Sequence, residues 1–79
     1  MITREQISTI NRLCNTNIVL FYPDPAGNGR YLQISRITEK VHFLNATVDS
    51  ELPLDFFDPG SIMIFGLKLN LNHLVGLGA

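Results

Sequence analysis

The sequence from Ile18 to Thr38, IVLFYPDPAGNGRYLQISRIT, determines the class of fold. Its first five residues are β-branched, aromatic or leucine, a composition typical of strands. Residues 23–29 contain two prolines and two glycines and predict a loop, because proline removes a backbone donor and glycine permits positive φ. From 30 to 38 a strand pattern resumes, with Leu32 and Ile34 expected on one face and Gln33 and Ser35 on the other. The stretch therefore predicts two strands joined by a loop.

On the N-terminal side, the sequence predicts a helix. Thr3-Arg4-Glu5-Gln6 matches a capping box, in which the Thr3 hydroxyl accepts from the third helical amide and Gln6 reaches back. Apolar residues then recur at helical spacing from Ile7 to Cys14. The helix is expected to end at Asn15-Thr16-Asn17, since short polar side chains compete for the backbone.

On the C-terminal side, a turn at Glu39-Lys40 and a third strand over 41–48 are expected. Residues 49–60 break the strand pattern. Within them, Pro53 suits the first turn of a short helix and Pro59-Gly60 is expected to stop it.

The last part of the chain allows two interpretations. A fourth strand is predicted over 61–69, followed by a turn and a short fifth strand over 73–77. Leucines also recur at helical spacing over 67–75, so a helix there is the alternative, although the glycines at 66, 76 and 78 oppose it.

These elements predict one domain of the α+β class spanning 1–79. An N-terminal helix is followed by about five antiparallel strands, which form a small bent sheet or a partly open barrel. A chain of 79 residues has room for one domain and no more.

The composition points to a binding protein. The chain is 46% hydrophobic, which argues against disorder, but only 16% charged, which is low for a small globular body. Uncovered apolar surface favours another protein, further domains of a longer chain, or a homo-oligomer as partner. A net charge of −1 gives no global attraction for nucleic acid, and no apolar run is long enough to cross a membrane. With a single cysteine and no leader, the cytoplasm is the expected location.

The residue types that carry catalysis do not form a recognisable site in the sequence. Cys14, the one cysteine, lies on the apolar stripe of the predicted helix and is expected to be packed there. His42 and His73 have none of the close spacing of metal ligands. We therefore expect a protein that is not an enzyme and has no cofactor or metal.

Two groups of residues are candidate contacts. Asp55, Phe56, Phe57 and Asp58 form the first, because two adjacent aromatics cannot easily both point inward and one is then an apolar anchor ringed by acids. In the alternative, both phenylalanines plug the open end of the sheet. Arg30, Tyr31 and Arg36 form the second, a thin basic and aromatic group that would serve nucleic-acid binding. On strand parity, Arg30 and Arg36 are expected on one face and Tyr31 on the other.

The order of elements resembles the N-terminal domain of flagellar brake proteins of the YcgR type. The segments that carry the likeness are Ile10-Asn11-Arg12-Leu13 before Ile18-Val19-Leu20-Phe21, Gly29-Arg30-Tyr31-Leu32, Pro59-Gly60-Ser61-Ile62-Met63-Ile64, and Leu67-Lys68-Leu69-Asn70. In that family the domain precedes a PilZ domain that binds cyclic di-GMP. The PilZ motifs RxxxR and [DN]xSxxG are absent here. The resemblance thus implies a regulatory module that contacts a protein, not one that binds the nucleotide itself.

Asn28-Gly29-Arg30-Tyr31-Leu32-Gln33 also resembles the first turn and second strand of the Sm-like family, which includes Hfq. That resemblance implies a helix followed by five bent strands in each chain, and assembly of several chains into an RNA-binding ring. Where that family usually bends its second strand at glycine, this chain has Ile34. A small inhibitor that acts by surface mimicry is a third hypothesis for a chain of this size.

Overall fold

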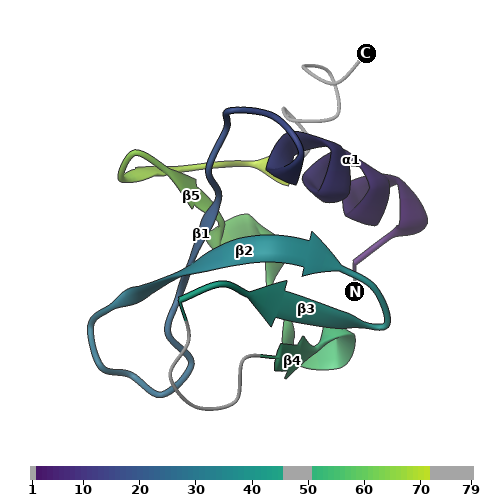
Figure 1. The fold of residues 1–79 in the computed structure, drawn as a ribbon. Coiled ribbons are helices and arrows are strands. Elements are labelled where there is room, and N and C mark those ends of the chain that lie inside the picture. The colour runs from purple at the N-terminus through teal and green to yellow at the C-terminus, as the bar shows by residue number, and fades with distance from the viewer. Residues whose placement is uncertain (1, 46–50, 72–79) are drawn as a thin grey trace.

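One helix and six antiparallel strands make up residues 2–45 and 51–71, the part of the chain that this computed structural model describes (Figure 1). The strands form a single open sheet in the order β4-β3-β2-β1-β5-β6. The α+β class, the N-terminal helix and the small bent antiparallel sheet are thus confirmed, with six strands in place of about five. The elements are α1 (Arg4–Cys14), β1 (Phe21–Pro23), β2 (Tyr31–Ile37), β3 (Lys40–Phe43), β4 (Glu51–Pro53), the 3-10 turns η1 (Leu54–Phe56) and η2 (Pro59–Ser61), β5 (Met63–Ile64) and β6 (Leu67–Lys68).

The start of α1 is the predicted capping box. The Gln6 amide donates to the Thr3 hydroxyl over 3.1 Å, and the Thr3 amide donates to the Gln6 side chain over 2.9 Å. The helix ends at Asn15, as expected. Asn11 ties the helix to the sheet, because its side chain donates to the Ile37 carbonyl over 2.8 Å and accepts from the Ile37 amide over 2.6 Å. Both polar groups at the end of β2 are thereby satisfied.

The two strands expected around the proline- and glycine-rich loop are present and pair with each other. Tyr22 lies opposite Leu32 in the antiparallel register of β1 and β2. The first strand is shorter than predicted, since residues 18–20 precede β1 and Pro23 is its last residue. Proline is accepted at this position because it ends the strand.

A register shift between Ile34 and Arg36 bends β2 against β3. Before it the even-numbered residues of β2 are buried, and after it Ile37 is buried and Arg36 exposed. The extra residue of a bulge moves the following side chains to the opposite face. The strict alternation expected for residues 30–38 is therefore wrong beyond Ser35.

The middle of the chain departs furthest from the sequence pattern. Strand β3 ends at Phe43, not at 48, and its expected last three residues lie outside the described part. A strand that was not predicted, β4, pairs with β3 and is followed directly by η1, for which Pro53 is the N-cap. Pro59 begins η2 where it was expected to stop a helix. Residues 54–62 thus lead from β4, one end of the strand order, to β5, which pairs with β1.

A tight hairpin replaces the predicted fourth strand. Phe65 and Gly66 have φ values of 49° and 82°, and they join two strands of two residues each, β5 and β6. Positive φ at both central residues is the geometry of a two-residue hairpin turn. The helical alternative for 67–75 is wrong at its start, because Leu67–Lys68 is a strand, and the fifth strand expected over 73–77 lies outside the described residues.

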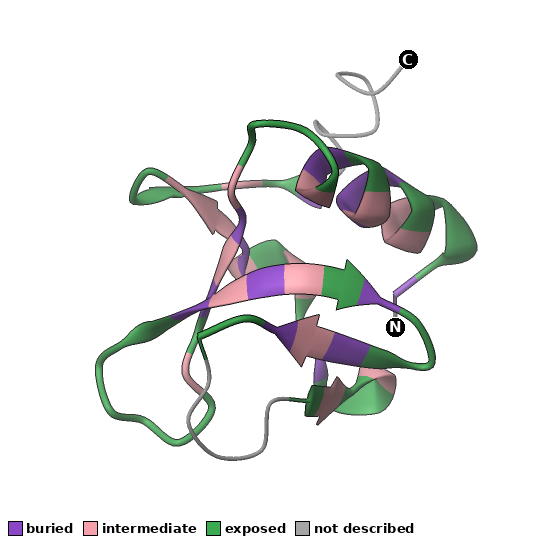
Figure 2. Ribbon diagram, viewed as in Figure 1, coloured by how far each residue is buried: buried purple, intermediate pink, exposed green. Residues whose placement is uncertain are grey.

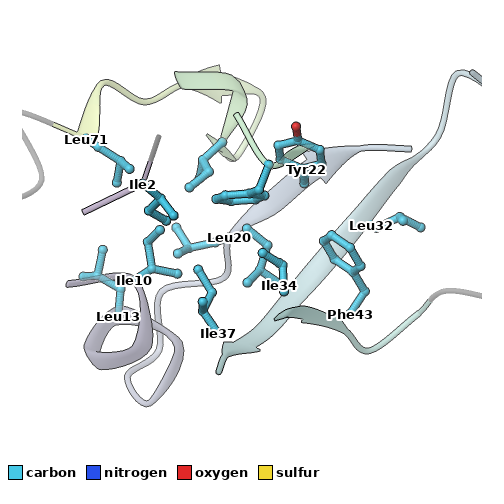
Figure 3. Packing of buried hydrophobic residues seen from close by; sticks show 13 residues of the cluster. Ile2, Ile10, Leu13, Leu20, Tyr22, Leu32, Ile34, Ile37, Phe43 and Leu71 are labelled. Carbon is cyan, nitrogen blue, oxygen red and sulfur yellow. The ribbon is translucent and has the colours of Figure 1, made fainter. Parts of the chain in front are cut away.

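The core lies between α1 and the inner face of the sheet. Figure 3 shows Ile10 and Leu13 of α1 directed toward Leu20 and Ile37. Exposed residues gather on the β1–β2 loop and at the tip beyond β5 (Figure 2). Within the described ranges, no helix has the length and apolarity to span a membrane. The buried apolar residues are Ile2, Ile10, Leu13, Leu20, Tyr22, Leu32, Ile34, Ile37, Val41, Phe43, Phe57, Ile62 and Leu71.

Candidate protein-interaction site

The adjacent phenylalanines of η1 and its cap have opposite environments. Phe56 is 76% exposed, whereas Phe57 is 4% exposed. The Phe57 ring stacks on Tyr22 with 4.8 Å between centroids and 29° between planes. One of the two is therefore an exposed aromatic, as the first interpretation expected, and the other fills the core. Phe57 itself is excluded from a surface contact by its burial.

The backbone on both sides of Phe57 is fixed. Its amide donates to the Leu54 carbonyl over 3.1 Å, which closes η1. The next amide, of Asp58, donates to the Tyr22 hydroxyl over 3.0 Å. Tyr22 also packs on Phe43 with ring centroids 6.1 Å apart. Phe56 therefore projects from a turn whose position is set by a buried neighbour and by two hydrogen bonds.

Asp55 and Asp58, the two acids of this segment, differ in their contacts. The Asp58 carboxylate accepts from the Ser61 hydroxyl over 2.8 Å and from the Gly60 amide over 3.0 Å. These two bonds, with that from Ser61 the larger effect, hold the pKa of Asp58 below its usual value. Asp55 is exposed and makes no hydrogen bond or ion pair with the described residues. Asp58 is thus the cap of η2, and Asp55 supplies the charge beside Phe56.

Tyr31 and Arg36 are both on the exposed side of β2, in contrast to the prediction from strand parity. Because of the register shift in β2, Arg36 belongs to the exposed phase of the strand, as does Tyr31, which is 48% exposed. The expectation that they lie on opposite faces is therefore wrong. Arg30 precedes β2 and is exposed. The patch carries two guanidinium groups and one phenol ring.

The side chains that were considered for catalysis make contacts within the fold. Burial raises the pKa of the Cys14 thiol to about 11, which disfavours the nucleophilic thiolate. His42 lies 3.4 Å from a Glu51 oxygen through Nδ1 and 2.8 Å from the Thr38 hydroxyl through Nε2. Glu51 also pairs with Lys40 over 3.3 Å. This chain of contacts joins the β2–β3 turn to β4.

The sequence pattern missed this link because β4 was expected to be irregular. Neither β3 nor the turn alone shows that Glu51 comes beside His42. No cluster of three potential metal ligands occurs among residues 2–45 and 51–71, and His73 lies outside them.

A second apolar surface, not predicted from the sequence, lies on the β5–β6 hairpin. Phe65 is 83% exposed and Leu67 is 72% exposed. The sequence pattern predicted both residues within one strand over 61–69, in phase with Met63 and Leu69. In the structure Met63 and Leu69 are half-buried. A phenylalanine in a two-residue turn gives little signal, because asparagine, aspartate or glycine is usual there.

Comparison of the chain with protein-family models, with curated proteins and with solved structures finds no match. The likenesses to YcgR-type and Sm-like proteins therefore stay predictions.

Proposed function

We propose that this chain is a non-enzymatic protein-interaction domain, a regulatory or signalling module that contacts its partner through Asp55 and Phe56. The observation that carries the proposal is the contrast between Phe56, 76% exposed, and Phe57, 4% exposed, on consecutive residues. Large aromatic side chains dominate the energetics of many protein interfaces.

The support beneath Phe56 suits it to binding. Burial of Phe57 and the Asp58–Tyr22 hydrogen bond fix the backbone on one side, and the η1 bond fixes it on the other. A preorganised anchor loses less conformational freedom when it enters a pocket, so more of its burial contributes to affinity. Asp55 adds a charge whose partner would be a basic side chain at the rim of that pocket.

The partner of Phe56 can be identified by photo-crosslinking. Benzoylphenylalanine is placed at position 56 and, as the matched control, at Leu44, a second exposed apolar position that is 66% exposed. We expect position 56 to give a discrete crosslinked protein. Position 44 should not crosslink that protein. Phe56→Ser should abolish capture of that protein, and Leu44→Ser should not.

The design leaves Phe57 intact, because its substitution is expected to unfold the domain. If Phe56→Ser and Leu44→Ser capture the same proteins to the same extent, the Phe56 contact is refuted. A small inhibitor that mimics a surface would use the same contact, and the identity of the crosslinked protein distinguishes the two forms of the proposal.

RNA binding through Arg30, Tyr31 and Arg36 is the second candidate, supported by the register shift that brings Arg36 into the exposed phase of Tyr31. Such binding should weaken steeply with added salt, because neutralised phosphates release counterions. Arg36→Gln should lower the slope of log affinity against log salt by roughly one. Absence of binding to a mixed-sequence single strand at low salt would exclude it.

A further inference from the structure

The last strand of the sheet, β6, has an open backbone edge. The Leu69 amide donates to the Ile62 carbonyl over 2.7 Å and so points toward the β5 side. Because alternate residues of an antiparallel strand point their amides to opposite sides, the Lys68 amide and carbonyl point away from β5. No strand follows β6 in the order of the described sheet. The groups of Lys68 are therefore available to a strand from another chain.

The apolar side chains of the β5–β6 hairpin are not buried by the rest of the described domain. Phe65 has a φ of 49°, a left-handed conformation that is unfavourable for a bulky residue, and yet it is 83% exposed. Leu67, two residues later, is 72% exposed. Neither the strained backbone nor the exposed surface is offset by burial within the described residues. A contact with another chain would supply that burial.

The β6 edge has two of the usual protections against pairing, its short length and the charge of Lys68, but within the described residues it lacks the others. Between Pro59 and Leu71 the only charged residue is Lys68, and no proline or bulge interrupts β6. Edge strands are usually protected by short length, charge, proline, a bulge or a covering element. At the opposite end of the sheet, β4 ends in Pro53 and has the Lys40–Glu51–His42 contacts beside it. Of the two edges, β6 is therefore the less protected.

We propose that β6 pairs antiparallel with β6 from a second copy of this chain, with the two Leu67 side chains facing each other across a two-fold axis. In this register the Lys68 amide donates to the carbonyl of the partner's Gly66, and the symmetric bond forms in return. The turn that carries Phe65 then lies beside the partner's Leu69. One sheet runs through both copies.

The register explains why the partner is a second copy. Leucine opposite leucine is a favourable cross-strand pair, and each lysine comes opposite a glycine. Gly66 has open space at the position a Cβ would occupy, so no side chain crowds the lysine. A shift that puts Lys68 opposite the partner's Lys68 places like charges in contact and is disfavoured. The edge is short, so the dimer should be weak and dependent on concentration.

The first test compares two substitutions of one residue by sedimentation velocity over a wide concentration range. The wild-type chain should pass from the monomer mass of 8.8 kDa toward twice that value. Lys68→Pro removes the outward amide without touching the β5 ladder, and it should weaken association roughly 10- to 100-fold, because both intermolecular bonds are lost. Lys68→Ala keeps the amide and should associate at least as well as wild type.

The second test examines the Leu67 contact by charge exchange. Leu67→Asp and Leu67→Lys should each be monomeric, because the axis places like charges together. An equal mixture should form a dimer, because the charges are then opposite. Both variants change only an exposed residue, so their far-ultraviolet CD spectra should match the wild type.

A wild-type chain that stays monomeric at all concentrations would overturn the proposal. That is the result expected if residues 72–79 or a different protein covered the edge. Equal association of Lys68→Pro and Lys68→Ala would also overturn it. So would a mixture of the Leu67 variants that stays monomeric. A dimer with unchanged affinity after all of these substitutions would place the interface elsewhere. The Phe56 contact is unaffected by any of these outcomes, because it uses other residues.

Discussion

The η1–η2 segment (54–61) and the β5–β6 hairpin (63–68) each present one phenylalanine to solvent, but they support it differently. Phe56 follows the short turn of η1, and the next residue is a core residue stacked on Tyr22. Phe65 occupies a left-handed turn position between two strands of two residues each. Exposure alone is therefore a poor guide to function. Rigid support favours an anchor for a pocket, whereas an open backbone edge favours strand pairing.

The largest expected difference is between the adjacent phenylalanines. Phe57→Ala removes a ring buried against Tyr22 and should lower the free energy of unfolding by about 3–5 kcal/mol, enough to unfold much of a domain of this size. Phe56→Ala should change it by no more than about 0.5 kcal/mol, because that ring is exposed. Urea unfolding followed by far-ultraviolet CD measures both. Equal losses would mean that Phe56 is also a core residue.

A smaller loss of stability is expected when the hydrogen bond between the Asp58 amide and the Tyr22 hydroxyl is removed. Tyr22→Phe keeps the stack on Phe57 but removes the hydroxyl that accepts from the Asp58 amide. The loss should be about 1 kcal/mol, since a part-buried donor is left without its partner. Tyr31→Phe, at an exposed ring, is the matched control and should be neutral. If both substitutions were neutral in urea unfolding, the Asp58–Tyr22 bond would not contribute to stability.

The helix and the β1–β2 hairpin could be predicted because their signals are local. The capping box needs only Thr3 and Gln6, and the loop needs only its prolines and glycines. The β-bulge after Ile34 and the strand Glu51–Pro53 could not be predicted, because both are set by pairing with β3. Long-range pairing overrides local pattern in such cases.

The candidate site was predictable in part for the same reason. Two adjacent aromatics in an irregular segment left two outcomes open, one ring exposed or both rings buried. Which one depends on where Tyr22 places its ring, and Tyr22 is more than thirty residues earlier in the sequence. The hairpin at Phe65-Gly66 gave a weak signal, because phenylalanine rarely adopts positive φ.

Phe65→Asn should stabilise the monomer by about 0.5–1 kcal/mol, because asparagine accepts the left-handed conformation that Phe65 is forced to adopt. Thermal unfolding at low concentration, below the range in which the proposed dimer would form, measures this gain. Gly66→Ala is the opposite control and should be destabilising by a similar amount, since φ is 82° there. At high concentration the gain should shrink, because the proposed dimer loses the aromatic contact. A destabilised monomer would show that the Phe65 ring contributes packing that its exposure does not reveal.

The smallest expected effect is a pH dependence of stability that distinguishes the η1–η2 segment from the β5–β6 hairpin. The pKa of Asp58 is lower in the folded chain than its usual value of 3.8, first because Ser61 donates to it and then because Gly60 does. Its bonds therefore stabilise the fold above pH 3.8, and this contribution is lost as the pH falls through the lower folded pKa. The group is exposed, so solvent screening limits the effect to a few tenths of a kcal/mol. Asp58→Asn should flatten this part of the acid dependence of urea unfolding.

Amide NMR during the same acid titration gives the sharper measurement. The signals of Gly60 and Ser61 should move with the titration of Asp58, because they bond its carboxylate. Those of residues 64–67 should not follow that titration, since this hairpin contains no acid, whereas Lys68 can respond weakly because its charge contributes to the lowered pKa of Asp58. Movement of both sets at one pH would mean that the hairpin depends on the η2 cap. The two exposed phenylalanines would then belong to a single cooperative surface, and the separate roles proposed for them would have to be abandoned.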